Sequence, residues 1–191
     1  MPFELQPILK GELIELRPLA PKDWDDLFAV ASDPLIWLQH PECDRYKEEV
    51  FKIFFKDALE SGGAFVVLDT KNKRIIGSTR FHGYDPEKSE IEIGWTFLAR
   101  KYWGGRYNRE MKQLMLAHAF KFVDNVVFFV GENNTRSRRA TEKIGAIKSG
   151  MAERVYGKRP PSLNVRYVIK KPQEKAESQG ISERGVYAPE N

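Results

Sequence analysis

Residues 94–108 run from a strand-like stretch through a turn with two adjacent glycines and directly into a helical stretch. Gly104 and Gly105 let the backbone approach a ligand without a Cβ clash, and the first N–H groups of a helix have no partner inside it. The helix dipole adds partial positive charge at the same place. Five cations against Glu110 give residues 100–112 a net charge of +4, from Arg100, Lys101, Arg106, Arg109 and Lys112. The stretch therefore predicts an anion-binding helix N-terminus, suited to a ligand with two or more phosphates.

The apolar residues elsewhere alternate between the two-residue period of strands and the 3.6-residue period of helices. This spacing predicts strands at residues 13–18, 64–69, 74–81, 90–97, 126–130, 146–156 and 163–169. It predicts helices at residues 24–31, 46–59, 107–122 and 135–144. The pair Asp33-Pro34 is interpreted as a break after the first helix. Strands and helices in this order indicate the α/β (α+β) class.

Length and composition predict one globular domain over residues 1–172, because 191 residues with 41% hydrophobic content can form one core. Residues 173–191 are polar and aperiodic, and we expect a flexible tail there. The longest apolar runs have five residues, which predicts no membrane span, and the N-terminus has no export signature, which predicts a cytoplasmic protein. Cys43 is the only cysteine, so no intrachain disulfide is expected.

The charge balance favours an anionic partner. The net charge is +4 overall and +6 over residues 1–172, because the last nineteen residues carry two cations and four acids. Nucleic acid, a phosphorylated cofactor and an acidic protein would all satisfy such a charge. A Gly-Lys-Ser/Thr phosphate loop and a three-glycine dinucleotide motif are both absent from the sequence.

A second cationic helix start lies at residues 133–146, again after a strand-like stretch. Asn134 and Ser137 open this helix as Asn-x-x-Ser, and Lys143-Ile144-Gly145-Ala146 ends it. Together with the earlier turn Lys101-Tyr102-Trp103-Gly104-Gly105-Arg106, this order resembles the GNAT acetyltransferase superfamily, which places a Gln/Arg-x-x-Gly-x-Gly/Ala turn before such a helix. Arg106 departs from that pattern, because it stands where the family has Gly or Ala.

The resemblance covers about residues 11–170. The segments Leu16-Arg17-Pro18-Leu19, Gly94-Trp95 and Tyr102-Trp103-Gly104-Gly105 are most similar to the branch that contains the ribosomal-protein (alanine/serine) N-acetyltransferases. It implies a mixed, mostly antiparallel central sheet with helices on both faces and a splayed strand pair that holds acetyl-CoA. It implies acetyl transfer to a primary amine, a protein N-terminal α-amine or a small-molecule amine, by direct attack in a ternary complex.

The resemblance also assigns the cofactor-binding residues. The pantetheine arm would pair with the strand before the turn and with Asn134, the turn would bind the pyrophosphate, and cations of the later helix would bind the 3′-phosphate. In chain order these residues are Trp95, Thr96, Phe97, Leu98, Lys101, Gly104, Gly105, Arg106, Tyr107, Asn108, Asn134, Arg138, Arg139 and Lys143. We predict no metal, since no histidine or carboxylate cluster has ligand spacing.

Acyl transfer from a thioester to an amine needs a base for the amine and a proton for the leaving thiolate. Ser137 stands at the family position that can protonate the thiolate, although a serine there also caps a helix. Glu92 alternates with apolar neighbours, so its side chain leaves the core face, and a partly dry cleft would raise its pKa into a useful range for a base. Glu90 is a weaker alternative base, and Tyr107 an alternative acid.

Two other functions stay open at this stage. A non-catalytic acyl-CoA-binding module would use the same fold, and an RNA-associated protein would use the basic helices, although no RNA-binding motif is present. We expect neither a DNA nor a membrane partner, and an oligomer is possible. The acceptor side is predicted to involve Trp37, His40, Asp44 and Tyr46, together with the loop near residues 156–162.

Overall fold

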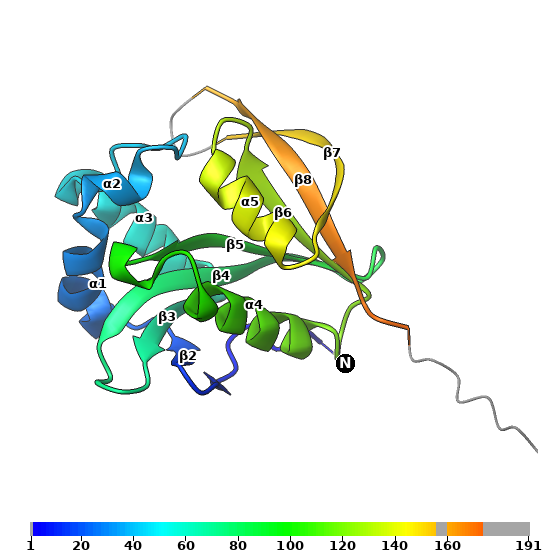
Figure 1. Ribbon diagram of the computed structural model, residues 1–191, viewed down its shortest axis with the longest axis horizontal. Coiled ribbons are helices and arrows are strands. Elements are labelled where there is room, and N and C mark those ends of the chain that lie inside the picture. The colour runs from blue at the N-terminus through cyan, green and yellow to red at the C-terminus, as the bar shows by residue number, and fades with distance from the viewer. Residues whose placement is uncertain (1, 156–159, 174–191) are drawn as a thin grey trace, which may run out of the picture.

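The computed structural model describes residues 2–155 and 160–173, which form one eight-stranded sheet in the order β1-β2-β3-β4-β5-β6-β8-β7 (Figure 1). Neighbouring strands are antiparallel except for the parallel pair β5 and β6. The strands are β1 (Leu9–Lys10), β2 (Ile14–Pro18), β3 (Ala64–Asp69), β4 (Ile75–Asp85), β5 (Glu90–Leu98), β6 (Asn125–Gly131), β7 (Ile147–Arg154) and β8 (Ser162–Lys170).

Helices cover both faces of this sheet, as the sequence predicts. One apolar cluster joins α1 (Trp24–Ala31), α2 (Pro34–Trp37) and α3 (Glu48–Glu60) to one face, and a second joins α4 (Arg106–Ala119) to the other. The last helix, α5 (Thr135–Lys143), follows β6 (Figure 1). The predicted fold class is therefore confirmed. In the described ranges, no helix is long and apolar enough to cross a membrane.

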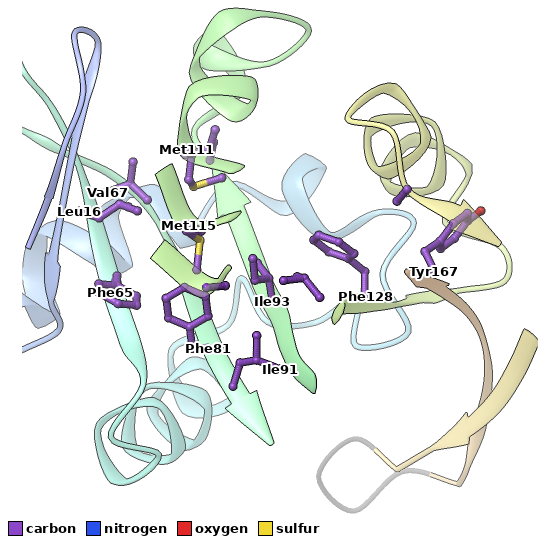
Figure 2. Packing of buried hydrophobic residues seen from close by; sticks show 14 of the residues in the cluster. Leu16, Phe65, Val67, Phe81, Ile91, Ile93, Met111, Met115, Phe128 and Tyr167 are labelled. Carbon is purple, nitrogen blue, oxygen red and sulfur yellow. The ribbon is translucent and has the colours of Figure 1, made fainter. Parts of the chain in front are cut away.

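The core beneath α4 is built from the alternating apolar residues of the central strands (Figure 2). Phe65, Phe81 and Ile91 are fully buried, and Met111 and Met115 of α4 pack onto them one helical turn apart. His118 belongs to the same helix face, is 4% exposed and contacts Phe81, so it is part of the packed core. This core fixes α4, and with it the position of the basic turn.

Two predicted boundaries are wrong, and one short helix follows the predicted break at Asp33-Pro34. Asp33-Pro34 begins a helix rather than only ending one, because the Asp33 carboxylate accepts the N–H of Leu35 (3.0 Å) and proline fits the first helical position. Strand β4 continues to Asp85 through exposed polar residues that show no apolar alternation. Helix α4 ends at Ala119 rather than residue 122, with a tight turn into β6. The predicted strand end at residue 156 and the tail residues 174–191 lie outside the described ranges.

The parallel pair β5 and β6 separates after three residue pairs, the last being Glu92 with Val127. Beyond this point β5 pairs only with β4. A bulge adds to the divergence, since Trp95 and Thr96 together oppose Thr79 of β4, and Trp95 has a φ of +50°. The two strands therefore form a V that opens toward the N-terminus of α4, which confirms the predicted splayed pair.

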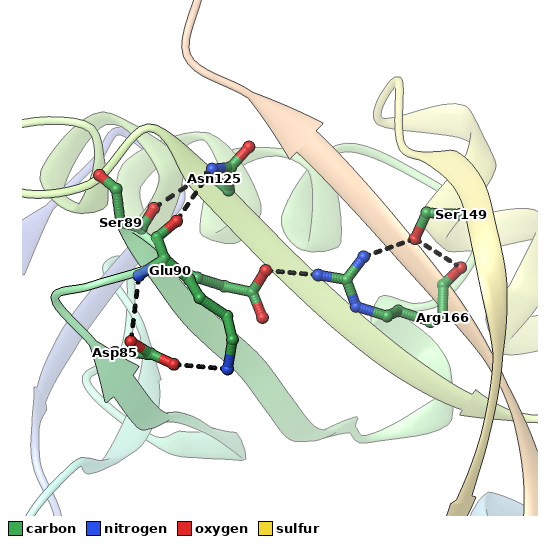
Figure 3. A network of polar contacts seen from close by, with 7 residues as sticks. Asp85, Ser89, Glu90, Asn125, Ser149 and Arg166 are labelled. Atoms are coloured by element: carbon green, nitrogen blue, oxygen red, sulfur yellow. Dashed lines mark hydrogen bonds and ion pairs between the residues drawn. The ribbon is translucent and has the colours of Figure 1, made fainter.

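The closed end of the V is fixed by polar contacts (Figure 3). Arg166 of β8 forms an ion pair with Glu90 of β5 and donates to Ser149 Oγ of β7 at 2.8 Å. Asn125 donates its backbone N–H to the Ser89 carbonyl at 2.9 Å. Glu90 is thus committed to an ion pair away from the open end of the V, which removes the reason for considering it as a base.

Replacement of Glu110 by alanine is expected to lower the free energy of unfolding by about 2 kcal/mol. The Glu110 carboxylate of α4 accepts the backbone N–H groups of Glu12, Leu13 and Ile14 at 2.8–2.9 Å, so the variant leaves three donors without this acceptor. Urea unfolding measures the change. The control is Glu60→Ala, whose exposed pair with Lys56 spans 3.8 Å and contributes at most about 0.5 kcal/mol. Equal losses in the two variants would contradict the prediction.

Candidate active site

A cleft of about 910 Å³ lies in the open part of the V between β5 and β6. Its walls come from β5, β6, the N-terminal turn of α4, helix α5 and the segment after α2. Eleven of the fourteen predicted cofactor-binding residues line it, in chain order Trp95, Thr96, Phe97, Leu98, Gly104, Gly105, Arg106, Asn108, Asn134, Arg139 and Lys143. The structure therefore brings the two motif segments together on opposite sides of one cleft.

The N-terminus of α4 forms the wide end of the cleft. Gly104 takes a φ of +76°, which favours glycine, and Gly105 is the N-cap residue with nothing within 4 Å of an added Cβ. The left-handed backbone angle of this turn therefore belongs to Gly104 and not to Gly105. Arg106 is the first helical residue and is exposed. The free N–H groups and the space in front of them suit an anion.

Helix α5 forms the facing wall. Asn134 is its N-cap, and the side-chain oxygen accepts the backbone N–H of Ser137 at 3.1 Å. Asn134 is 6% exposed and lines the cleft together with Ser137. Ser137 thus occupies the first turn of the helix, and its side chain is partly exposed. Asn134 is committed as a cap through its oxygen, which leaves its amide group as the donor toward a ligand.

Three predicted cofactor residues have side chains outside the cleft lining. Arg138 donates to the Tyr167 hydroxyl at 3.1 Å and to the Glu132 carbonyl at 3.2 Å, so it braces α5 against β8. Lys101 lies 4.9 Å from the ring of Tyr102. The ring of Tyr107 packs against the ring of the same tyrosine, with 4.7 Å between the ring centroids. Only the main chain of Tyr107 remains at the anion-binding turn.

Glu92 occupies a small recess beside the cleft, where it is 6% exposed. Arg154 of β7 donates to both carboxylate oxygens, at 2.8 and 3.2 Å. Burial raises the pKa of Glu92 above its ordinary value, and the attraction of Arg154 opposes this shift. The carboxylate lies against Gly94, since an added Cβ there would stand 3.1 Å from Glu92 Oε1. Its side chain does leave the core face, as predicted, but it is an ion-paired group rather than a solitary one.

The match to a known domain settles the family. The profile described as the acetyltransferase (GNAT) domain matches residues 14–147. The chain belongs to the GNAT acetyltransferase family. None of the curated proteins compared with this GNAT chain matches it.

Solved structures share this GNAT fold. A GNAT-family acetyltransferase from Bacillus anthracis has a TM-score of 0.70 and 26% identity, over 85% of this chain and 98% of that one. A candidate ribosomal-protein-serine acetyltransferase from Vibrio cholerae has a TM-score of 0.72 and 11% identity, over 87% and 99%. Mycobacterium smegmatis RimJ, solved with CoA-disulfide, has a TM-score of 0.65 and 15% identity, over 86% of each chain.

The side of the GNAT cleft that faces α2 is aromatic and cationic. Trp37 and His40 line the cleft as predicted, whereas Asp44 and Tyr46 do not. Arg45 lines it as well, with its guanidinium 5.5 Å from the ring of Trp37. Residues 156–159 of the predicted acceptor loop lie outside the described ranges.

Sequence reasoning missed three further cations of the GNAT cleft and its edge. Arg136 lies 4.0 Å over Trp103 and donates to the Ile36 carbonyl at 2.7 Å, which connects α5 to α2 across the cleft. Lys112 lies on the cleft floor although it is 6% exposed. Arg154 reaches Glu92 from 62 positions away. For Lys112, the only indication in the sequence was the local excess of positive charge. For Arg154 there was no indication, because its pairing with Glu92 depends on strands that are far apart in the sequence.

Proposed function

We propose that this chain is an acetyl-CoA-dependent N-acetyltransferase that acts on a primary amine, either a protein N-terminal α-amine or the amine of a small molecule. One observation carries the proposal: the strands β5 and β6 separate after Glu92 and Val127, and the cleft so formed ends at the glycine N-cap of α4. An extended ligand with amides in its middle and phosphates at one end matches both parts of this cleft.

The residues present fit acetyl-CoA. The unpaired edge of β5 at Trp95–Leu98 offers backbone groups to the pantetheine arm, in the manner of an added strand. Gly104 and Gly105 leave room for the pyrophosphate at the N–H groups of Arg106, Tyr107 and Asn108. Arg139 and Lys143 line the α5 wall as cations for the 3′-phosphate. Acetyl-CoA supplies the activated acyl group, and the protein supplies position and proton transfer.

Glu92 is the proposed base. Its buried carboxylate, held by two bonds from Arg154, can accept the proton of an ammonium group or orient the amine through water. Ser137, on the opposite wall, is the proposed proton donor to the leaving thiolate. Ser137 lines the cleft from α5, and Glu92 lies on β5 in the recess beside it, so the two proposed groups come from different elements. Direct transfer in a ternary complex needs no thiol in the protein, and the single cysteine, Cys43, is exposed and does not line the cleft.

Glu92→Gln is expected to lower kcat about 100-fold, which is a typical contribution of a general base. The carboxylate accepts a proton only when ionised, so wild-type kcat falls as the pH drops through the raised pKa of Glu92. In the glutamine variant, kcat should no longer fall at acid pH for this reason. Rates of thiol release between pH 5 and 9 measure both effects. If kcat of Glu92→Gln still falls at acid pH as in the wild type, another group is responsible for the fall. The matched control Glu90→Gln should retain the wild-type fall of kcat at acid pH.

Calorimetric titration of acetyl-CoA, followed by thiol-release assays with peptides and small amines, tests the proposed function. Micromolar binding and release of CoA in the presence of an amine are expected, with kcat lowered in Ser137→Ala while binding is retained. Binding without release on any acceptor would favour a coenzyme-binding module. Absence of binding at physiological salt would overturn the proposal.

A further inference from the structure

Lys112 places a primary amine inside the cleft. It lies two turns into α4, and its Nζ donates to Thr96 Oγ1 of β5 at 2.6 Å. The same Nζ is 5.8 Å from the ring centroid of Phe128 on β6. The amine therefore lies between the two strands of the V, beyond their last residue pair. Thr96 is exposed to the cleft, so the Lys112 amine is covered by a side chain that itself borders the open space.

The environment of this amine is apolar and hydroxylic. Thr96 Oγ1 also contacts Thr79 Oγ1 at 2.8 Å, and Thr79 Oγ1 lies 3.5 Å from the sulfur of Met115. Within residues 2–155 and 160–173, no carboxylate forms an ion pair with Lys112. Burial lowers the pKa of Lys112 to about 7. A far larger fraction of Lys112 side chains is then neutral at pH 7 than of ordinary lysines, of which fewer than about one in a thousand are neutral.

A ligand with its phosphates at the N-terminus of α4 must run along β5 toward the closed end of the V. That path passes Thr96 and the amine that it covers. A neutral primary amine is the acceptor class of the proposed reaction, and here one belongs to the cleft itself. The geometry thus places a nucleophile of the acceptor type beside the path of the acetyl donor.

We propose that Lys112 is a self-acetylation site, at which the cleft transfers one acetyl group from bound acetyl-CoA to its own lysine when no acceptor amine is present. This inference rests on the proposed function. Lys112 Nζ forms a bond to the acetyl carbon, the carbon–sulfur bond of the thioester breaks, and the proton lost by the amine goes to the CoA thiolate. The products are Nζ-acetyl-Lys112 and CoA with a free thiol.

The modification would regulate the cleft. Acetylation prevents the Lys112 side chain from carrying a positive charge. It also adds an acetamide to a residue that is only 6% exposed. The acetamide needs space on the cleft floor beneath Thr96. We expect the modified protein to bind CoA at least tenfold more weakly. In the absence of its acceptor, the protein would then acetylate itself and bind less acetyl-CoA.

Incubation of the full chain with acetyl-CoA at pH 7, without acceptor, tests this inference by mass spectrometry. The expected result is one acetyl group per chain on the peptide that contains Lys112, with calorimetry of CoA binding on the same samples. The exposed lysines are internal controls, because chemical acetylation of an ordinary lysine rises about 100-fold between pH 7 and 9. Modification of Lys112 should rise much less over this range, because burial lowers its pKa to about 7.

Two controls separate the site from chemical acetylation. Excess CoA should protect Lys112 and leave the exposed lysines unaffected, and Lys112→Arg should lose the single modification. Protection is read in the wild-type chain, so it does not depend on the variant folding. If the chain binds acetyl-CoA while Lys112 stays unmodified, or is modified no faster than the exposed lysines, self-acetylation is overturned and the proposed function stands. If acetyl-CoA does not bind, both proposals fail.

Discussion

Gly105→Glu is expected to weaken the binding of CoA about 1,000-fold, which is about 4 kcal/mol. Residue 105 is the N-cap of α4, and the proposed pyrophosphate site lies directly before it. A carboxylate there places a negative charge against two phosphates and occupies the space that glycine leaves open. A negative charge at the N-terminus of a helix interacts favourably with the helix dipole, so the fold should not be weakened by the change. Calorimetry gives the affinity, and thermal unfolding gives the stability.

The matched control is Gly105→Gln, which has the same size without the charge. We expect a loss of about tenfold for glutamine, so that about two further orders of magnitude measure the charge alone. The difference should shrink as the salt concentration rises, because the site is exposed to solvent. Equal affinities of the glutamate variant and the wild type would place the phosphates elsewhere, and with them the direction of the ligand in the cleft.

Gly77→Ala is expected to lower the free energy of unfolding by about 3 kcal/mol. Gly77 lies in β4 between Val67 and Leu98, and an added Cβ would stand 2.0 Å from the carbonyl oxygen of Phe97. It would also stand 3.0 Å from the Cα of Leu98. Both atoms belong to the backbone of β5, so the strand itself must move. Thermal unfolding should show a fall in Tm of roughly 10 °C.

Gly105→Ala is the control for this substitution. Nothing lies within 4 Å of the added Cβ, and the φ of −156° lies outside the left-handed region that favours glycine. Its stability should change by less than about 0.5 kcal/mol. The displacement of β5 in Gly77→Ala should also reduce CoA affinity, since Phe97 and Leu98 line the cleft. A variant as stable as the wild type would mean that β4 and β5 are further apart than described.

Local pattern predicted most elements of the fold, because their apolar faces are regular. The predicted ranges 64–69 and 135–144 show how closely the prediction follows the structure, with β3 at Ala64–Asp69 and α5 at Thr135–Lys143. The prediction failed where backbone hydrogen bonds, and not apolar residues, determine where a strand or helix begins and ends. Strand β4 extends through His82 to Asp85 because its backbone pairs with the start of β5. Helix α2 is a single turn set by the Asp33 cap, too short to show a period.

The candidate site divides in the same way. Main-chain positions were predictable, since the glycines and the helix start identify the anion-binding turn without knowledge of distant contacts. Side-chain partners were not predictable. Arg138 lies on the cationic helix but turns to Tyr167, which is 29 positions away. Glu92 was chosen for its place in the strand, whereas its actual state depends on Arg154 of β7. Charge alone therefore does not say which cations of a helix face the ligand.

The short pairing of β5 with β6 means that backbone hydrogen bonds are spread unevenly over the sheet. Only three residue pairs join the backbone of β6 to that of β5, whereas β4 and β5 pair along most of their length, and the apolar core beneath α4 spans both parts of the sheet. At the open end of the V, no backbone pairing between β5 and β6 therefore resists a change in the width of the cleft. A ligand bound between the two strands would add contacts across this gap. Its release would remove those contacts and leave the cleft free to widen for the next ligand.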